Sequence, residues 1–339
     1  MPAKIRVLIV DDSALMREAL KSLLEENPSI EVIGIAKDGK EGVEKALALR
    51  PDVITMDLKM PLLSGIEAIE RIMEECPIPI IVVSGMDTEV IVKALSLGAM
   101  DFVSVTQDIE LISKELTEKI LIAARVKPLK RLKFKKSPAR DVCRIDTKRP
   151  AAKIVAIGVS TGGPQALEAV LSRLPADFNA GILVVQHMSK GFIVGMAEWL
   201  NTTSHLKVKV GNTGDSVTAG TIFLAPDSYH MLIDANGRIL LKEELNRNAL
   251  HVPSITATMK SAAENYGSEA IGVIMTGMGS DGLDGIKAIK KAGGMTISQD
   301  EKTSIVFGMN KAAIDSGYID RILPLEKIAE ELVSAIKGD

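Results

Sequence analysis

Three apolar runs in the second half of the chain each end beside a side chain suited to nucleophilic catalysis. The first run, 153–159, leads into Ser160 within Gly158-Val159-Ser160-Thr161-Gly162. Gly-x-Ser-x-Gly is typical of a tight strand-to-helix turn that exposes a nucleophilic serine. Pro164 suits the start of a helix over 165–174, whose N-terminal N–H groups would stabilise a developing anion. A phosphate-binding or purely structural glycine turn is the alternative. A dinucleotide site fits poorly, because serine replaces the second glycine of Gly-x-Gly-x-x-Gly.

A nucleophilic serine needs a general base, and the chain has four histidines. His187 ends the apolar run 181–187, so we expect it at the carboxyl end of a strand, like Ser160. His205 lies in a polar stretch, His230 at the start of a predicted hairpin, and His251 in a predicted loop. His187 is therefore the expected base, and a purely structural histidine is the alternative.

The third catalytic group should be a carboxylate that follows another strand. Asp281 lies in the glycine-rich segment after the apolar run 270–276. Asp300, at the end of the run 295–299, is the second choice, and Asp284 is expected to face solvent on a helix. The resulting order, serine then histidine then aspartate, differs from that of α/β-hydrolases but is compatible with the same chemistry.

Acidic side chains gather at predicted strand ends in the first half of the chain. Asp11 and Asp12 follow the first apolar run, Asp57 the third and Ser84 the fourth. Carboxylates that converge on one sheet edge repel one another unless a cation lies between them, and a small set of oxygen ligands suits Mg²⁺. An aspartate beside Mg²⁺ can attack phosphorus. Helix capping is the alternative for any one of these residues taken singly.

The elements that would hold these side chains alternate along the whole chain. In the first half, runs of strand length alternate with stretches that carry apolar residues at helical spacing. The predicted strands are 5–10, 31–36, 53–56, 78–83 and 101–105, and the predicted helices include 13–26, 39–49 and 65–75. This alternation predicts an α/β domain with a doubly wound parallel sheet. Residues 153–339 alternate in the same way, which predicts a second such domain.

Composition fits a two-domain globular protein of 339 residues, of which 46% are hydrophobic and 25% charged. Intrinsic disorder is excluded for most of the chain. No apolar run approaches the roughly 18 residues of a membrane span. The N-terminus does not read as a secretory signal, so we expect a cytoplasmic protein without membrane insertion. Two cysteines are too few for a disulfide framework or a metal knuckle.

Charge divides the chain into three parts. Residues 1–122 carry 13 basic and 22 acidic groups, 123–152 carry 11 and 2, and 153–339 carry 17 and 20. The basic segment is expected to be a solvated linker between two domains, with a tether to an acidic partner as the alternative. Nucleic-acid binding is not expected, because the chain has only ten aromatic residues and no basic recognition helix.

The first 122 residues resemble the receiver domain of bacterial response regulators, which has a flavodoxin-like fold. The matching segments are VLIVDDSALMR (7–17), PDVITMDLKMPLLSGIEAI (51–69), VVSGM (82–86) and GAMDFV (98–103). The resemblance implies that Asp57 accepts phosphate from a histidine kinase. It also implies that Asp11 and Asp12, with Asp57, hold Mg²⁺, that Ser84 contacts the phosphoryl group, and that Phe102 takes part in the switch.

One departure from the receiver pattern concerns a lysine. Receivers usually have Lys-Pro after the fifth strand, where this chain has Val105-Thr106. The lysine would pair with the phosphoryl oxygens, and valine cannot. Lys59, two residues after Asp57, is the one close candidate to compensate. We therefore expect a weaker coupling between phosphorylation and the conformational switch.

Residues 153–339 resemble the catalytic domain of the CheB-type chemotaxis receptor methylesterases, with a Rossmann-like three-layer α/β/α fold. The matching segments are GVSTGGP (158–164), VVQHM (184–188), TGMGSDG (276–282) and QDEKTSIVFGM (299–309). The resemblance implies Ser160 as nucleophile, His187 as general base and then acid, and Asp281 as the group that orients the imidazole. Met278 matches the position whose backbone N–H helps to form the oxyanion hole.

The implied reaction is hydrolysis of glutamyl methyl esters on chemoreceptors, regulated by phosphorylation, with deamidation of receptor glutamines as a related activity. The implied partners are methylated chemoreceptors and a histidine kinase, and the esterase needs no cofactor. A non-enzymatic signalling adaptor is the rival interpretation, and the complete serine, histidine and aspartate set argues against it. A transcription regulator is a more distant one.

Overall fold

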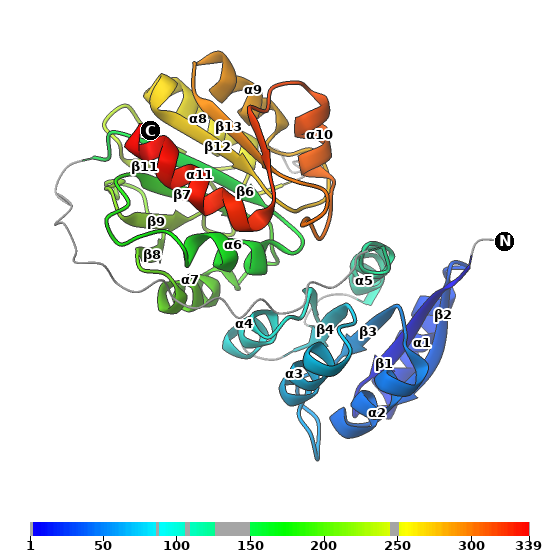
Figure 1. Cartoon of the computed structure of the whole chain (residues 1–339). Coiled ribbons are helices and arrows are strands. Elements are labelled where there is room, and N and C mark those ends of the chain that lie inside the picture. The colour runs from blue at the N-terminus through cyan, green and yellow to red at the C-terminus, as the bar shows by residue number, and fades with distance from the viewer. Residues whose placement is uncertain (1–2, 86–87, 106–108, 126–149, 245–250, 339) are drawn as a thin grey trace. The chain divides into compact units, whose positions relative to one another are not determined.

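The computed structural model describes residues 3–85, 88–105, 109–125, 150–244 and 251–338. The chain divides into two compact units, residues 1–133 and 134–339 (Figure 1). Most of the predicted linker, 126–149, therefore lies outside the described residues, as do Met86 and Thr106 of the receiver-like segments.

The first unit is a five-stranded parallel sheet with the strand order β2-β1-β3-β4-β5. Strands and helices alternate as predicted, and the order is that of the flavodoxin-like doubly wound fold. The elements are β1 Ile5–Val10, α1 Ala14–Glu25, β2 Ile30–Ala36, α2 Gly39–Leu49, β3 Val53–Met56, α3 Gly65–Glu75, β4 Ile80–Ser84, α4 Thr88–Ser96, β5 Asp101–Ser104 and α5 Ile109–Ala123.

The fourth strand starts later than the apolar run predicts. It begins at Ile80 instead of residue 78, because Pro77 and Pro79 have no N–H to donate to a neighbouring strand. It also extends to Ser84, which is therefore the last residue of the strand and not the first residue after it. All five residues of β4 are buried.

The second unit contains a seven-stranded parallel sheet with the order β14-β13-β12-β6-β7-β9-β8. A separate antiparallel hairpin pairs β10 with β11 around the predicted turn at 236–237. The elements are β6 Ile154–Val159, α6 Gly163–Leu171, β7 Gly181–Gln186, α7 Ile193–Thr203, β8 Lys207–Val210, β9 Thr221–Leu224, β10 Tyr229–Ile233, β11 Ile239–Glu243, α8 Ile255–Tyr266, a 3-10 turn Gly267–Glu269, β12 Ala270–Ile274, α9 Leu283–Lys291, β13 Met295–Gln299, α10 Met309–Asp315, β14 Arg321–Leu323 and α11 Leu325–Lys337.

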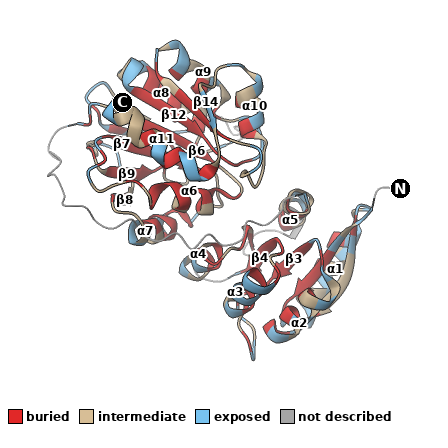
Figure 2. Cartoon of the chain, viewed as in Figure 1, coloured by how far each residue is buried: buried red, intermediate tan, exposed pale blue. Residues whose placement is uncertain are grey.

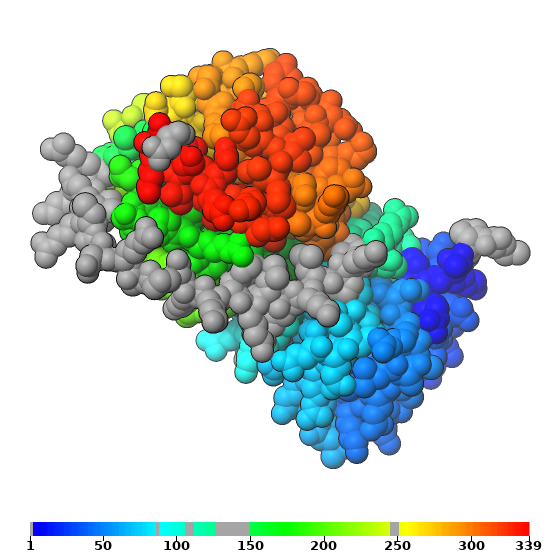
Figure 3. Space-filling view, viewed as in Figure 1, coloured from blue at the N-terminus to red at the C-terminus, as the bar shows by residue number. Residues whose placement is uncertain are grey.

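Two apolar cores lie on opposite faces of this sheet and make the unit three-layered. One core joins the sheet to α6, α7 and α11, and the other joins it to α8, α9, α10 and the hairpin. Figure 2 shows the central strands buried and the outer sides of the helices exposed. The space-filling view of Figure 3 shows the outer side of α11 (red) at the surface of the second unit. The three-layer α/β/α prediction is confirmed.

The helix after Ser160 differs from the prediction at both ends. It begins at Gly163, because Gly162 adopts the left-handed conformation (φ 75°) and turns the chain directly into the helix. Pro164 lies in its first turn, where its missing N–H is not needed. It ends at Leu171 instead of residue 174, since Pro175 disfavours helical geometry in the residue before it.

Candidate active site

Ser160, the residue that follows β6, is fixed by two backbone hydrogen bonds. Its N–H donates to the carbonyl of Thr276 at 3.0 Å, and its own carbonyl accepts from the N–H of Gly163 at 2.8 Å. Gly277 passes so close that a Cβ there would lie 2.7 Å from the Cβ of Ser160. The loop after β12 and the turn after β6 are therefore packed directly against each other at this serine.

Strand register brings His187 next to Ser160. In the parallel pair β6–β7, Val159 is opposite Gln186, so Ser160 and His187 are the next residues in register. The N–H of His187 donates to the carbonyl of Val159 at 3.0 Å. The buried side-chain amide of Gln186 donates to the carbonyls of Ser160 and His187 at 2.8 and 2.7 Å. Two adjacent strand ends thus hold the serine and the histidine at one edge.

His187 contacts Asp281 through its Nε2, which lies 3.0 Å from Oδ2 of the carboxylate. The two side chains are 11% and 9% exposed. Because an ionised carboxylate only accepts hydrogen bonds, Nε2 carries the proton and Nδ1 keeps its lone pair. Nδ1 is buried and has no hydrogen-bond partner in the described part of the chain, and no hydrogen bond joins it to Ser160 Oγ there. An unpaired, basic nitrogen therefore remains at the serine edge.

The N-terminus of α8 holds Asp281 in place. Its Oδ2 accepts from the N–H of Ile255 at 2.8 Å, and its Oδ1 accepts from the N–H of Thr256 at 3.0 Å and the hydroxyl of Ser254 at 3.1 Å. Burial alone would raise the pKa of Asp281, but the hydrogen bonds from His187 and from these groups outweigh it and hold that pKa far below its usual value. The carboxylate is therefore ionised throughout the neutral range.

A second histidine, His230, contacts the N-cap residue of α8. Ser254 is the N-cap of this helix, and its N–H donates to Nδ1 of His230 at 3.0 Å. Nε2 of the buried His230 lies 2.9 Å from a carboxylate oxygen of Glu244. A hydrogen-bonded chain thus runs from Glu244 through His230 and Ser254 to Asp281. His230, which was not the expected base, is thus linked to Asp281 through Ser254.

A third histidine, expected only as a loop residue, lies against the base itself. The rings of His251 and His187 are stacked, with centroids 4.4 Å apart and planes inclined by 10°. Burial and the neighbouring His187 lower the pKa of His251. Sequence reasoning missed this contact. The available signal was Pro253-Ser254 before an apolar run, which marks a helix N-terminus three residues after His251.

Met278 lies at the rim of this site. Its side chain is 50% exposed, and in the described part of the chain no acceptor is found for its N–H. The loop that carries it is fixed by the bonds of Gly277 N–H to the carbonyl of Val306 (3.0 Å) and of Met309 N–H to the carbonyl of Gly277 (2.9 Å). A free, rigidly held N–H can donate to an anion.

The two alternative carboxylates have partners other than His187. Oδ1 of Asp300 accepts from the N–H and the hydroxyl of Thr303 at 3.0 and 2.6 Å, and so stabilises its own loop. Asp284 pairs with Lys287 at 3.1 Å on the exposed side of α9. Of the three aspartates considered, Asp281 is the one that meets His187.

In the first unit, the predicted acidic cluster lies at the carboxyl ends of β1 and β3. Ser84 Oγ donates to Oδ1 of Asp57 at 2.8 Å, and Ser13 N–H donates to Oδ1 of Asp11 at 2.8 Å. Burial, followed by the neighbouring carboxylates of Asp57 and Asp12, raises the pKa of Asp11 to about 6, and burial also raises the pKa of Asp57. These carboxylates repel one another without a cation.

No three histidine, cysteine or acidic side chains of the described residues are arranged as a ready-made metal cage. Mg²⁺ is usually bound through one or two carboxylates together with several waters, so it needs no such cage. The neighbouring carboxylates raise the pKa of Asp11, and a cation between them would lower it again. This repulsion is the feature of the cluster that fits a bound cation.

The predicted switch residue Phe102 is buried in β5. Lys119 of α5 lies 5.4 Å from the centre of its ring, donates to its carbonyl at 2.6 Å, and pairs with Asp101 at 2.8 Å. Burial opposes its charge, yet Asp101 and Glu115 raise the pKa of Lys119 above its usual value. Lys119 was not expected from the sequence, and its partners lie at the start of β5 and on α5.

Lys59 was the side chain expected to compensate for the missing lysine near Asp57. Lys59 has an exposed side chain, and it is its backbone N–H that lowers the pKa of Asp57. Arg17 donates to the carbonyl of Asp11 at 2.8 Å and lowers the pKa of that carboxyl. Arg17 is therefore a cation that acts on the acidic cluster, and sequence reasoning did not identify it. Val105 follows β5, and its N–H donates to the carbonyl of Ser84 at 3.4 Å.

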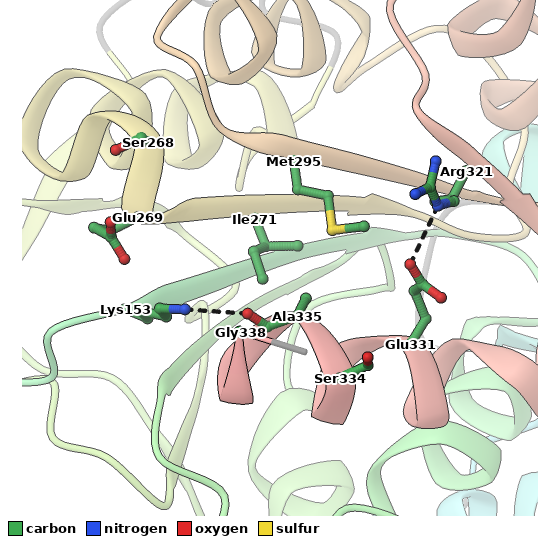
Figure 4. A pocket seen from close by; sticks show the side chains of 10 residues that line it. All are labelled: Lys153, Ser268, Glu269, Ile271, Met295, Arg321, Glu331, Ser334, Ala335 and Gly338. Atoms are coloured by element: carbon green, nitrogen blue, oxygen red, sulfur yellow. Dashed lines mark hydrogen bonds and ion pairs between the residues drawn. The ribbon is translucent and has the colours of Figure 1, made fainter.

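A pocket of about 350 Å³ lies at the opposite edge of the second sheet, near the amino ends of its strands (Figure 4). Its cations already have partners. Lys153 donates to the carbonyls of Ala335 and Ile336 at 3.1 and 3.2 Å, and Arg321 pairs with Glu331 at 3.3 Å. These contacts tie α11 to the sheet, so this pocket is not a candidate site.

The chain is similar to known proteins over nearly its whole length. The family model of the CheB methylesterase matches residues 155–332, and that of the response regulator receiver domain matches residues 7–117. The chain is 43% identical to a protein-glutamate methylesterase/protein-glutamine glutaminase of Thermotoga maritima over 98% of both chains. A protein of the same name from Pyrococcus abyssi is 41% identical, over 98% of this chain and 94% of that protein.

The solved structures include the methylesterase catalytic domain of Thermotoga maritima CheB. It is 42% identical, with a TM-score of 0.52, and the match covers 54% of this chain and 98% of that domain. Among the described residues of this chain, no helix has the length and hydropathy needed to span a membrane.

Proposed function

Because the chain belongs to the CheB methylesterase family, we propose that it is a protein-glutamate methylesterase that hydrolyses glutamyl methyl esters of chemoreceptors and deamidates receptor glutamines. Ser160 is the nucleophile, His187 the general base and Asp281 the group that orients it. The observation that carries this assignment is the bond from His187 Nε2 to Asp281. It leaves the other ring nitrogen basic at the edge where Ser160 follows its strand.

The reaction begins with transfer of the Ser160 hydroxyl proton to Nδ1 of His187 while Oγ attacks the ester carbonyl. Asp281, ionised and held by the first turn of α8, stabilises the imidazolium that forms. The oxygen of the tetrahedral intermediate accepts a hydrogen bond from the N–H of Met278, which is not engaged within the described part of the chain.

Collapse of the intermediate expels methoxide, which takes the proton from His187 and leaves as methanol. The glutamyl group is now an ester of Ser160. Water then attacks this ester, with His187 again as base, and releases the glutamate and the free serine. A glutamine substrate forms the same acyl-enzyme with ammonia as the leaving group, so one site serves both activities.

The first unit supplies regulation in this proposal. Asp57 accepts a phosphoryl group from a histidine kinase, Ser84 contacts that group, and Phe102 takes part in the switch. Asp11, Asp12 and Asp57 would hold Mg²⁺, which when bound neutralises part of the charge on the carboxylates and the phosphoryl oxygens. The raised pKa values of Asp11 and Asp57 support a cation at this edge.

Partners and location follow from the same assignment. The substrates are the cytoplasmic segments of methylated chemoreceptors, and the phosphodonor is the chemotaxis histidine kinase. We place the enzyme in the cytoplasm, where both are accessible to it. Neither nucleic acid nor membrane insertion has a part in the proposal.

The test is methanol release from methylated receptor membranes, measured with and without a small-molecule phosphodonor. Wild type should release methanol, and faster with the phosphodonor. Ser160→Ala should release none while keeping its circular dichroism spectrum. Methanol release that persists in folded Ser160→Ala would assign the nucleophile to another residue. A wild type that binds the receptors without any turnover would favour the adaptor interpretation.

A further inference from the structure

The stacked pair formed by His251 and His187 goes beyond the serine, histidine and aspartate set. His187 is held at two atoms, its backbone N–H and its Nε2. Rotation of the ring about the Cβ–Cγ bond moves Nδ1, which lies farther from that axis, more than it moves Nε2, so these two contacts fix Nδ1 only in part. The direction of Nδ1, which must meet the serine hydroxyl, depends on that rotation. A flat group against one face of the ring would fix it.

His251 is such a group. Its ring lies 4.4 Å from that of His187 and within 10° of parallel, which is an aromatic stack. His251 is exposed overall, so one face of its ring covers the base while the residue remains at the surface of the site. It is followed by Pro253 and by Ser254, the N-cap that also bonds Asp281. The same short segment therefore contacts both the base and its carboxylate.

We propose that His251 is a positioning residue for the esterase, whose imidazole stacks on His187 and holds Nδ1 toward the hydroxyl of Ser160. This inference rests on the proposed function. His251 takes no proton from the substrate and forms no covalent bond.

The charge of the second ring matters for the same reason. His187 becomes positively charged each time it accepts the serine proton, and two imidazolium rings at this separation repel each other. The titratable groups that act on His251 are His187 and Asp281. Burial and His187 lower the pKa of His251, while Asp281 raises it. A neutral His251 can stabilise the imidazolium through its ring face, whereas a protonated one opposes it.

The kinetic test compares His251→Phe with His251→Ala in the full chain, with methanol release as the assay. Phenylalanine keeps a flat ring, so its kcat should stay within about twofold of wild type. Alanine removes the ring, and its kcat should fall about tenfold with KM unchanged, because the loss concerns orientation of the base and not substrate binding. His205→Ala, which removes an imidazole from the loop before β8, is the matched control and should behave as wild type.

A second measurement needs no activity. The titration of the His251 ring is followed by NMR in wild type and in His187→Gln. In the stacked pair its pKa should lie below the usual value for histidine, and it should rise when His187 is replaced, because His187 lowers the pKa of His251. Equal His251 titrations in the two proteins would overturn the stack.

The kinetic measurements can also overturn the positioning role. A folded His251→Ala with wild-type kcat, or a His251→Phe as slow as His251→Ala, would overturn the positioning role. A rise in KM with unchanged kcat would make His251 a substrate-binding residue instead. The failure of the proposed function is separate, because it would be seen as turnover by Ser160→Ala or as an inactive wild type.

Discussion

The side-chain amide of Gln186 donates to the carbonyl oxygen of Ser160 at 2.8 Å, and so joins the ends of two neighbouring strands. Its second bond, to the carbonyl of His187 at 2.7 Å, joins the histidine to the same amide. Gly163 packs against this side chain so closely that a Cβ there would lie 1.9 Å from Oε1. The spacing between the nucleophile and the base is therefore set by a buried side chain as well as by sheet register.

Replacing Gln186 with methionine should weaken both the fold and the reaction. The change keeps the length of the side chain but removes both hydrogen bonds, which leaves two carbonyls without that donor. We expect the free energy of unfolding of the second unit to fall by about 1–3 kcal/mol. We expect kcat for methanol release to fall about tenfold. Gln165→Met in α6 is the control, and equal effects of the two substitutions would argue against a specific role for Gln186.

Asp281→Asn should remove most of the turnover. An asparagine in this position can present its oxygen or its amide to His187 but cannot stabilise the imidazolium by charge. By analogy with the triad of serine proteases, we expect kcat to fall about 10³- to 10⁴-fold with the fold intact. The measurement is methanol release together with circular dichroism. Activity within tenfold of wild type would show that Asp281 does not serve His187.

Asp281 should also make the stability of the second unit dependent on pH. Its pKa is lower in the folded chain than in the unfolded chain, so its contribution is present above about pH 4 and is lost as the pH falls toward the folded value. Denaturant unfolding at a series of acidic pH values should give a steeper decline for wild type than for Asp281→Asn. Parallel curves would show that the carboxylate is not stabilised by its hydrogen bonds to α8.

How far the site could be predicted from the sequence depends on which residues lie near one another along the chain. Ser160 and His187 each end an apolar run, and runs of a parallel sheet end at one edge, so their proximity follows from local patterns. The roles of His230 and His251 do not follow, because they depend on how the loop before α8 packs against the loop that carries Asp281. The hydrogen bonds of Asp281 to Ser254, Ile255 and Thr256 join residues 25 to 27 positions apart in the chain, beyond the reach of any periodicity.

The elements themselves were predicted well, and their ends less well. The alternation of strands and helices, both sheets and the hairpin turn at Asn236-Gly237 all agree with the structure. The errors lie where backbone chemistry acts over one or two residues, as at Pro79 before β4 and Pro175 after α6. In the first unit, Arg17 and Lys119 were missed because the contacts that give them a role are made by folding.

Asp11 gives a prediction for the first unit. Its folded pKa of about 6 lies above the unfolded value, so ionisation costs stability, and that loss develops as the pH rises from about 4 to about 6. At neutral pH, Asp11→Asn should therefore stabilise the chain by about 1–2 kcal/mol in a metal-free buffer.

The effect of Mg²⁺ separates this stabilisation from function. Mg²⁺ should raise the Tm of the first unit in wild type, because an ion that binds only the folded state stabilises it by mass action. Asp11→Asn should lose most of this rise. Glu67→Gln, at the start of α3 and outside the acidic cluster, should keep it. A rise that is equal in wild type and Asp11→Asn would remove Asp11 from the set of proposed Mg²⁺ ligands.

Val105 provides the last prediction, which concerns the size of the regulatory response. A phosphoryl group on Asp57 adds roughly two negative charges, and Mg²⁺ neutralises only part of them. Receivers usually add a lysine at the position of Val105, and here the cation that acts on Asp11 is Arg17, which donates to a backbone carbonyl. We expect Val105→Lys to increase the ratio of esterase activity with phosphodonor to activity without it.

Lys59→Ala tests the alternative source of charge in the same assay. The Lys59 side chain is exposed, and its contact with Asp57 is made by its backbone N–H, which alanine keeps. If its ammonium group compensates for the missing lysine by moving toward the phosphoryl group, Lys59→Ala should decrease the activity ratio, while Lys40→Ala on α2 should leave it unchanged. A large wild-type ratio that neither Val105→Lys nor Lys59→Ala alters would mean that this receiver switches without a lysine. In that case another group must contact the phosphoryl oxygens in place of the lysine. The Ser84 hydroxyl, 2.8 Å from Asp57, is in position to do so.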